Sequence, residues 1–95
     1  FYAFLQPTMG IGEFHPTQEE KRMYQDMIKF KGLDFENALN NFYIQAISFC
    51  QNYEFAYDIT NVFKDENDVY RDPRHQNKKG VDIISKKIRE IVFAF

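Results

Sequence analysis

Two short apolar runs, far apart along the chain, have the composition of buried strands. The first extends from Phe1 to Leu5 and is followed by Gln6 and Pro7. A helix is disfavoured there because the run is short and a residue before proline avoids helical backbone. The second, aromatic run extends from Glu54 to Ile59. We expect this second strand to end near Asp58.

Between the two runs, apolar residues recur at helical spacing. The segment from Thr17 to Glu20 matches a capping box, which predicts that a helix begins there, and Gly32 is a typical stop. Asp34 is predicted to cap a second helix that ends at about Gln51. The apolar positions of the two helices are Met23, Tyr24, Met27, Ile28, Phe35, Ala38, Leu39, Phe42, Ala46, Ile47, Phe49 and Cys50. We interpret both stripes as core.

Two further segments complete the chain. Residues 7–16 contain two glycines and two prolines, which favours an irregular loop with Met9, Ile11 and Phe14 available to line an apolar site. A last helix is predicted to begin near Asn77 or Lys78 and to lie on the sheet. Its apolar face comprises Val81, Ile84, Ile88, Ile91 and Val92.

The order strand, helices, strand, helix is typical of an α/β fold. Strands joined by a long helical crossover are normally parallel neighbours, so the loops that follow them leave from one edge of the sheet. Open α/β folds bind ligands at that edge. We therefore expect His15, the turn at residues 10–12, Asp72 and His75 to share one rim, although a lone histidine such as His15 is more often a packed loop residue.

Length and composition narrow the function classes. The 95 residues suit one domain, and the net charge of −2 gives no overall attraction to nucleic acid or to an anionic membrane. Basic residues gather in the C-terminal third, which we interpret as a solvated helix face. The clustered aromatic residues are interpreted as core and not as a base-stacking platform, so no nucleic-acid partner is predicted. Cys50 is the single cysteine, which excludes an internal disulfide.

No apolar run approaches the roughly 18 residues of a membrane span, and no signal-peptide pattern is present. The chain begins without Met, directly in an apolar run. We expect that the start of a longer parent protein is missing. The polar run at residues 65–68 is followed by Val69 and Tyr70 where an EF-hand loop needs a glycine, so no calcium site is predicted there.

The candidate chemistry lies at Asp72 and His75, three residues apart with Pro73 between them. A carboxylate that accepts from Nδ1 of a histidine fixes the imidazole tautomer and leaves Nε2 free to act as a general base. The plain alternative is a surface aspartate followed by a helix-capping histidine. Another alternative makes Asp72 and His75, with or without His15, ligands of zinc or iron.

The context of this pair resembles the last conserved block of the SGNH (GDSL-type) hydrolases. The matching features are a strand that ends in Asp58, Asp-x-x-His at Asp72 and His75, then Asn77, Gly80 and an apolar helix. Supporting likeness comes from Phe4-Leu5-Gln6-Pro7 and from Thr17-x-Glu19-Glu20. The resemblance covers nearly the whole chain.

The resemblance implies a Ser-His-Asp hydrolase of O-acyl esters, on a small molecule or a carbohydrate, with a flavodoxin-like three-layer α/β/α sandwich. This chain, residues 1–95, would be the C-terminal part of that domain, with two parallel strands and about three helices. His75 would be the general base, Asp72 would orient it, and Asn77 with Gly80 would set the start of the last helix. No cofactor and no metal are implied.

Other catalytic blocks of that family are absent here. The only serines, Ser48 and Ser85, lie in helical patterns and not in a strand-to-helix turn. The nucleophile and the oxyanion-hole residues are therefore expected in the N-terminal half of the same domain, and the fragment alone is expected to be inactive. The alternative function is a non-catalytic α/β module that binds through the loop at residues 7–16.

Overall fold

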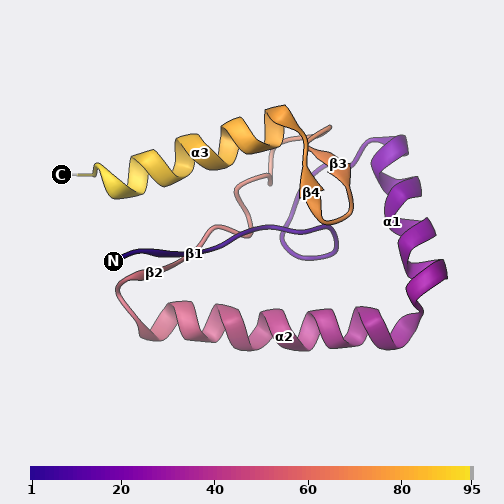
Figure 1. The fold of residues 1–95 in the computed structure, drawn as a ribbon, viewed down its shortest axis with the longest axis horizontal. Helices are drawn as coiled ribbons and strands as arrows, with labels where there is room; N and C mark the ends of the chain where they lie inside the picture. The colour runs from indigo at the N-terminus through magenta and orange to yellow at the C-terminus, as the bar shows by residue number, and fades with distance from the viewer. Residues whose placement is uncertain (95) are drawn as a thin grey trace.

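Two short strands lie between helices in the computed structural model, which describes residues 1–94 (Figure 1). The elements in chain order are β1 (Ala3–Leu5), α1 (Gln18–Lys31), α2 (Leu33–Asn52), β2 (Ala56–Asp58), β3 (Tyr70–Asp72), β4 (His75–Gln76) and α3 (Lys78–Val92). Figure 1 shows α2 along one side of β1 and β2, with α3 along the other side and α1 across one end. The fold is mixed α/β.

The parallel pairing of β1 and β2 confirms the predicted strands and their direction. Ala3 lies opposite Ala56, and Leu5 lies opposite Asp58. Just beyond this pairing, the Ile59 amide donates to the Leu5 carbonyl at 3.0 Å. The connection contains α1 and α2, so the loops after β1 and after β2 leave the sheet at the same edge, as expected for parallel strands.

Helix α1 begins as the capping box predicts. The Thr17 hydroxyl accepts from the Glu20 amide at 3.1 Å, and the Glu20 carboxylate accepts from the Thr17 amide at 3.0 Å. The prediction that Asp34 caps the next helix is wrong. Helix α2 begins at Leu33, directly after Gly32, and no side chain caps it. Gly32 has a φ of 87°, so one glycine both ends α1 and begins α2.

The prediction that the α2 stripe is core is wrong in degree. No residue of α2 is fully buried, Phe42 is 63% exposed, and Cys50 is only partly buried. The physical reason is length: a 20-residue helix extends about 30 Å, whereas the three-residue strands beneath it extend about 10 Å. The described strands therefore cover only part of the apolar face of α2.

The buried core lies at the other end of the fold, around the segments that follow β1 and β2. It contains Met9, Ile59, Phe63, Val69, Tyr70 and Ile84. Helix α3 begins after Asn77, as predicted, and its Ile84 packs into this cluster, whereas Val81 is 48% exposed. The short hairpin β3–β4, which the sequence did not predict, is anchored to the core through Val69 and Tyr70.

Gly80 lets the first turn of α3 approach the backbone before β3. Asn77 caps the helix by accepting from the Gly80 amide at 2.9 Å, and a Cβ on Gly80 would collide with the Val69 carbonyl oxygen and lie 2.9 Å from Cβ of Gln76. Both residues therefore set the helix start, as expected from the sequence.

Replacing Gly80 by alanine is expected to destabilise the protein by about 1–3 kcal/mol, although alanine is otherwise the better helix former. The cause is overpacking against Val69. The matched control is Ser85→Ala at an exposed position of α3, which is expected to change the free energy of unfolding by less than about 0.5 kcal/mol. Urea denaturation measures both. Equal effects of the two substitutions would contradict the close approach.

Candidate functional site

Asp72 and His75 occupy the two ends of the turn between β3 and β4. They lie opposite each other in the antiparallel pairing, and Pro73 with Arg74 forms the turn. Nδ1 of His75 lies 2.9 Å from Oδ1 and 3.0 Å from Oδ2 of Asp72. The structure therefore brings together the two side chains that the sequence singled out.

Backbone amides hold the Asp72 carboxylate in place. Oδ1 of Asp72 accepts from the amide of Arg74 at 2.9 Å and from the amide of His75 at 3.0 Å. The pKa of Asp72 is lowered chiefly by the Arg74 amide. Slight burial opposes this shift, and the His75 side chain, its charge and its amide add to it. The carboxylate is therefore ionised at neutral pH and ready to accept from Nδ1.

The imidazole of His75 is open to solvent on its other side. The side chain of His75 is 65% exposed, and no hydrogen bond engages its Nε2 within residues 1–94. His75 belongs to β4, and Asn77 caps α3. The interpretation of His75 as a helix-capping residue is therefore wrong. In this arrangement Nε2 can exchange a proton with a group that approaches from outside.

The loop after β1 lies directly against the turn of this hairpin. The Pro73 carbonyl accepts from the Met9 amide and from the Thr8 hydroxyl, each at 3.1 Å, and the Gln76 side chain donates to the Pro7 carbonyl at 3.1 Å. These contacts join the hairpin to the edge of the sheet where β1 ends.

The loop after β2 reaches the same region through the turn at residues 10–12. Gly12 has a φ of 79° and lies against the Thr60 carbonyl, and the Glu13 amide donates to the Asn61 side chain at 2.8 Å. The loop after β1 thus contacts both the loop after β2, at the glycine turn, and the Asp72–His75 turn. Asn61, which the sequence analysis did not single out, thus holds the glycine turn against the loop after β2.

His15 lies at another part of this loop, beside the charged segment. Its amide donates to the Glu66 carbonyl at 2.9 Å, and its side chain is exposed. Across residues 1–94, no three His, Cys, Asp or Glu side chains gather in a group that could hold a metal ion. The metal-site alternative for His15, Asp72 and His75 therefore gains no support from the geometry.

Glu20 binds the backbone at the start of the β3–β4 hairpin through its carboxylate. Glu20 is 1% exposed, and its carboxylate accepts from the amides of Asp68, Val69 and Tyr70 at 2.9, 3.0 and 3.1 Å, in addition to its capping contact. A capping box alone predicts a local role at the helix start. Nothing in the local pattern of residues indicates that the same carboxylate also binds three amides about fifty positions away.

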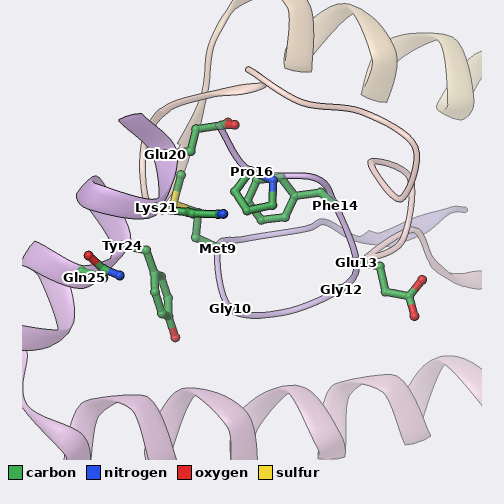
Figure 2. Close-up of a pocket in the computed structure, with 10 residues that line it drawn as sticks. All are labelled: Met9, Gly10, Gly12, Glu13, Phe14, Pro16, Glu20, Lys21, Tyr24 and Gln25. Atoms are coloured by element: carbon green, nitrogen blue, oxygen red, sulfur yellow. The ribbon is translucent and has the colours of Figure 1, made fainter. Parts of the chain in front are cut away.

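A second feature is a cavity of about 390 Å³ between the loop at residues 7–16 and α1 (Figure 2). Its wall contains Met9, Gly10, Gly12, Glu13, Phe14, Pro16, Glu20, Lys21, Tyr24 and Gln25. Met9 and Phe14 line it as expected, whereas Ile11 does not. The cavity is the size of a small-molecule pocket.

The remaining nucleophile candidates lie in helices. Ser48 is in α2 and Ser85 is in α3. Burial raises the pKa of the Cys50 thiol, and the negative charge of Asp58 adds to this effect, which disfavours the reactive thiolate. Within residues 1–94, no nucleophilic side chain makes a hydrogen bond to His75.

None of the described helices is long and apolar enough to cross a bilayer.

Comparisons with known proteins identify no relative of this chain. No protein-family model matches the chain, and no curated protein or solved structure matches it at a significant level.

Proposed function

We propose that this chain is the C-terminal part of a serine ester hydrolase of the SGNH type, in which His75 is the general base and Asp72 orients it. The observation that carries the proposal is the contact of 2.9 Å between Nδ1 of His75 and the Asp72 carboxylate, with Nε2 facing solvent. This is the geometry that a Ser-His-Asp triad requires of its last two members.

In the proposed reaction, Nε2 of His75 takes the proton of a serine hydroxyl as the serine attacks the ester carbonyl. The Asp72 carboxylate stabilises the resulting imidazolium and keeps its ring oriented. His75 then returns the proton to the departing alcohol. The acyl group now remains on the serine oxygen. A water molecule, deprotonated by His75, attacks this acyl group, and the return of the proton to the serine oxygen releases the carboxylic acid. The substrate class is an O-acyl ester of a small molecule or a carbohydrate.

The proposed domain is a flavodoxin-like α/β/α sandwich. Support comes from the parallel pairing of β1 and β2 and from the helices along both sides of them (Figure 1). It also comes from the hairpin, which lies beyond the carboxyl ends of the strands and is joined to the loop after β1. Ligands bind at that edge in open α/β folds.

The nucleophilic serine and the oxyanion donors are proposed to belong to an N-terminal half of the same domain. Acyl transfer needs a serine within hydrogen-bond reach of Nε2 and preorganised donors for the oxyanion. The described helical serines do not occupy such a position. Residues 1–95 alone are therefore expected to show no ester turnover.

Intact mass spectrometry of the native polypeptide, before and after treatment with a fluorophosphonate, tests this proposal. We expect a mass above that of the 95 residues and a single covalent adduct, because an activated serine attacks the phosphorus atom. Denatured protein is the control and should take no adduct. A longer chain that stays unlabelled under native conditions would contradict the hydrolase proposal.

The second candidate function is a non-catalytic module that binds a small molecule. The cavity between the loop at residues 7–16 and α1 favours it, because Met9, Phe14 and Tyr24 provide apolar wall (Figure 2). A longer chain that takes no fluorophosphonate adduct would place this candidate ahead of the first.

A further inference from the structure

Arg74 lies in the turn between the two members of the proposed catalytic pair, and its charge has no carboxylate partner among residues 1–94. The guanidinium carbon lies 4.8 Å from the centroid of the Phe35 ring, close enough for cation–π attraction. Throughout residues 1–94, no carboxylate forms an ion pair with Arg74 and no acceptor receives a side-chain hydrogen bond from it. The stacking on Phe35 restrains the side chain and leaves its donors available.

The neighbouring acid, Asp72, does not serve as this missing partner. Its Oδ1 accepts from two backbone amides, and both carboxylate oxygens contact Nδ1 of His75. The Arg74 residue contributes its amide to that arrangement, whereas its guanidinium lies over a ring of α2. An acid supplied by a ligand would therefore not have to displace an internal ion pair.

A cavity of about 330 Å³ opens beside the guanidinium. Its wall contains Gln6, Pro7, Thr8, Leu39, Phe42, Tyr43, Arg74 and Gln76. Two polar side chains of the wall already have partners: the Tyr43 hydroxyl donates to the Gln6 carbonyl at 3.3 Å, and the Gln76 side-chain amide donates to the Pro7 carbonyl. The site thus combines apolar wall from α2 with one unpaired cation.

We propose that this cavity binds the carboxylate-bearing part of the ester substrate, with Arg74 as the residue that selects for the negative charge. This inference rests on the proposed function and specifies its substrate class. The planar guanidinium matches a carboxylate by two parallel hydrogen bonds, and Leu39 with Phe42 contacts the methylene chain. Arg74 and His75 belong to the same hairpin, so a substrate whose carboxylate binds Arg74 extends its methylene chain and its ester from this cavity toward the proposed general base.

Matched substrates separate charge recognition from ester turnover. In the full-length protein, kcat/KM is measured for mono-4-nitrophenyl adipate and for 4-nitrophenyl hexanoate, which have equal chain lengths and differ in the terminal carboxylate. Arg74→Gln is expected to lower the adipate-to-hexanoate ratio by about tenfold, since hydrogen bonds to charged groups contribute strongly but Arg74 is exposed. The ratio for Arg74→Lys should lie between those of the unmodified protein and Arg74→Gln, because lysine keeps the positive charge but cannot form the two parallel hydrogen bonds of a guanidinium.

The control is Arg71→Gln, which removes the same charge from an exposed position of the same hairpin. It is expected to change the ratio by less than about twofold because distant surface charges are screened. Equal changes in the ratio for Arg74→Gln and Arg71→Gln would overturn the inference and leave the hydrolase proposal intact.

If neither ester is hydrolysed, that result counts against the proposed hydrolase function but not against the proposed carboxylate site. A binding measurement then tests the site directly. NMR titration of the same protein with hexanoate and with hexanol then tests the cavity. We expect hexanoate to shift the signals of Phe42 and Tyr43 and to bind about tenfold more weakly to Arg74→Gln. Equal affinity for hexanoate and hexanol, or no binding of either, would overturn the inference.

Discussion

Replacing His75 by alanine in the full-length protein is expected to lower ester turnover by about four powers of ten or more, since the loss of a triad base has effects of that size. The reason is that no other described side chain can accept the serine proton at this position. The other histidine, His15, lies beside Glu66 in an exposed part of its loop. His15→Ala is the matched control and should retain turnover. Initial rates with a 4-nitrophenyl ester measure both variants.

The loss of activity should occur without loss of structure. The His75 side chain is exposed, and within the described residues 1–94 its hydrogen bonds join it to Asp72 alone. The free energy of unfolding should therefore change by less than about 1 kcal/mol, as for other exposed ion pairs. Unchanged turnover in a folded His75→Ala variant would show that the histidine is not the base.

Asp72→Asn provides a companion to this experiment. An asparagine oxygen can still accept from the amides of Arg74 and His75, so the turn is expected to persist. Its amide group would favour the wrong imidazole tautomer, which in a triad lowers kcat by about 10⁴-fold. A rate close to that of the unmodified protein would exclude the proposed role of Asp72.

The elements that could be predicted from sequence are those specified by local chemistry. The capping box at Thr17, the proline after Gln6 and the cap at Asn77 each act within a few residues, and each boundary lies near its predicted place. The spacing of Asp72 and His75 is local in the same sense. Their contact follows from a short turn, so the sequence was sufficient to predict it.

Features that depend on distant partners were missed or misjudged. Strands β3 and β4 have three and two residues, too few for a periodic pattern. The apolar stripe of α2 indicates which face is apolar but not how much of it the strands cover. Arg74 resembles any basic surface residue until its position over Phe35, contributed by another element, is known.

Glu20 is the distant partner with the largest expected effect on stability. Its Oε1 accepts from the amides of Thr17 and Asp68, and its Oε2 accepts from the amides of Val69 and Tyr70. Burial opposes the charged form, but these four amides outweigh burial and hold the pKa of Glu20 below its usual value of 4.5. The buried carboxylate thus joins α1 to the strand that carries Asp72.

Glu20→Gln is expected to destabilise the protein by about 2–4 kcal/mol at neutral pH, because an amide NH₂ would face amide donors in a buried site. That is a large share of the roughly 5–15 kcal/mol by which a domain is stable. The matched control is Glu19→Gln, which removes the same charge one residue earlier, where Glu19 pairs with Arg22 at the surface. The control should lose less than about 1 kcal/mol. Denaturant unfolding measures both.

The pH dependence gives this prediction a second test. Because the folded pKa of Glu20 lies below the unfolded value of 4.5, its stabilising contribution is present above that pH and is lost as the pH falls through the folded pKa. Unfolding free energies should therefore decrease with acidification below 4.5. Glu20→Gln should show a smaller decrease than Glu19→Gln over the same range. Parallel pH profiles for the two variants would contradict the role of Glu20, since only the buried carboxylate binds the four amides.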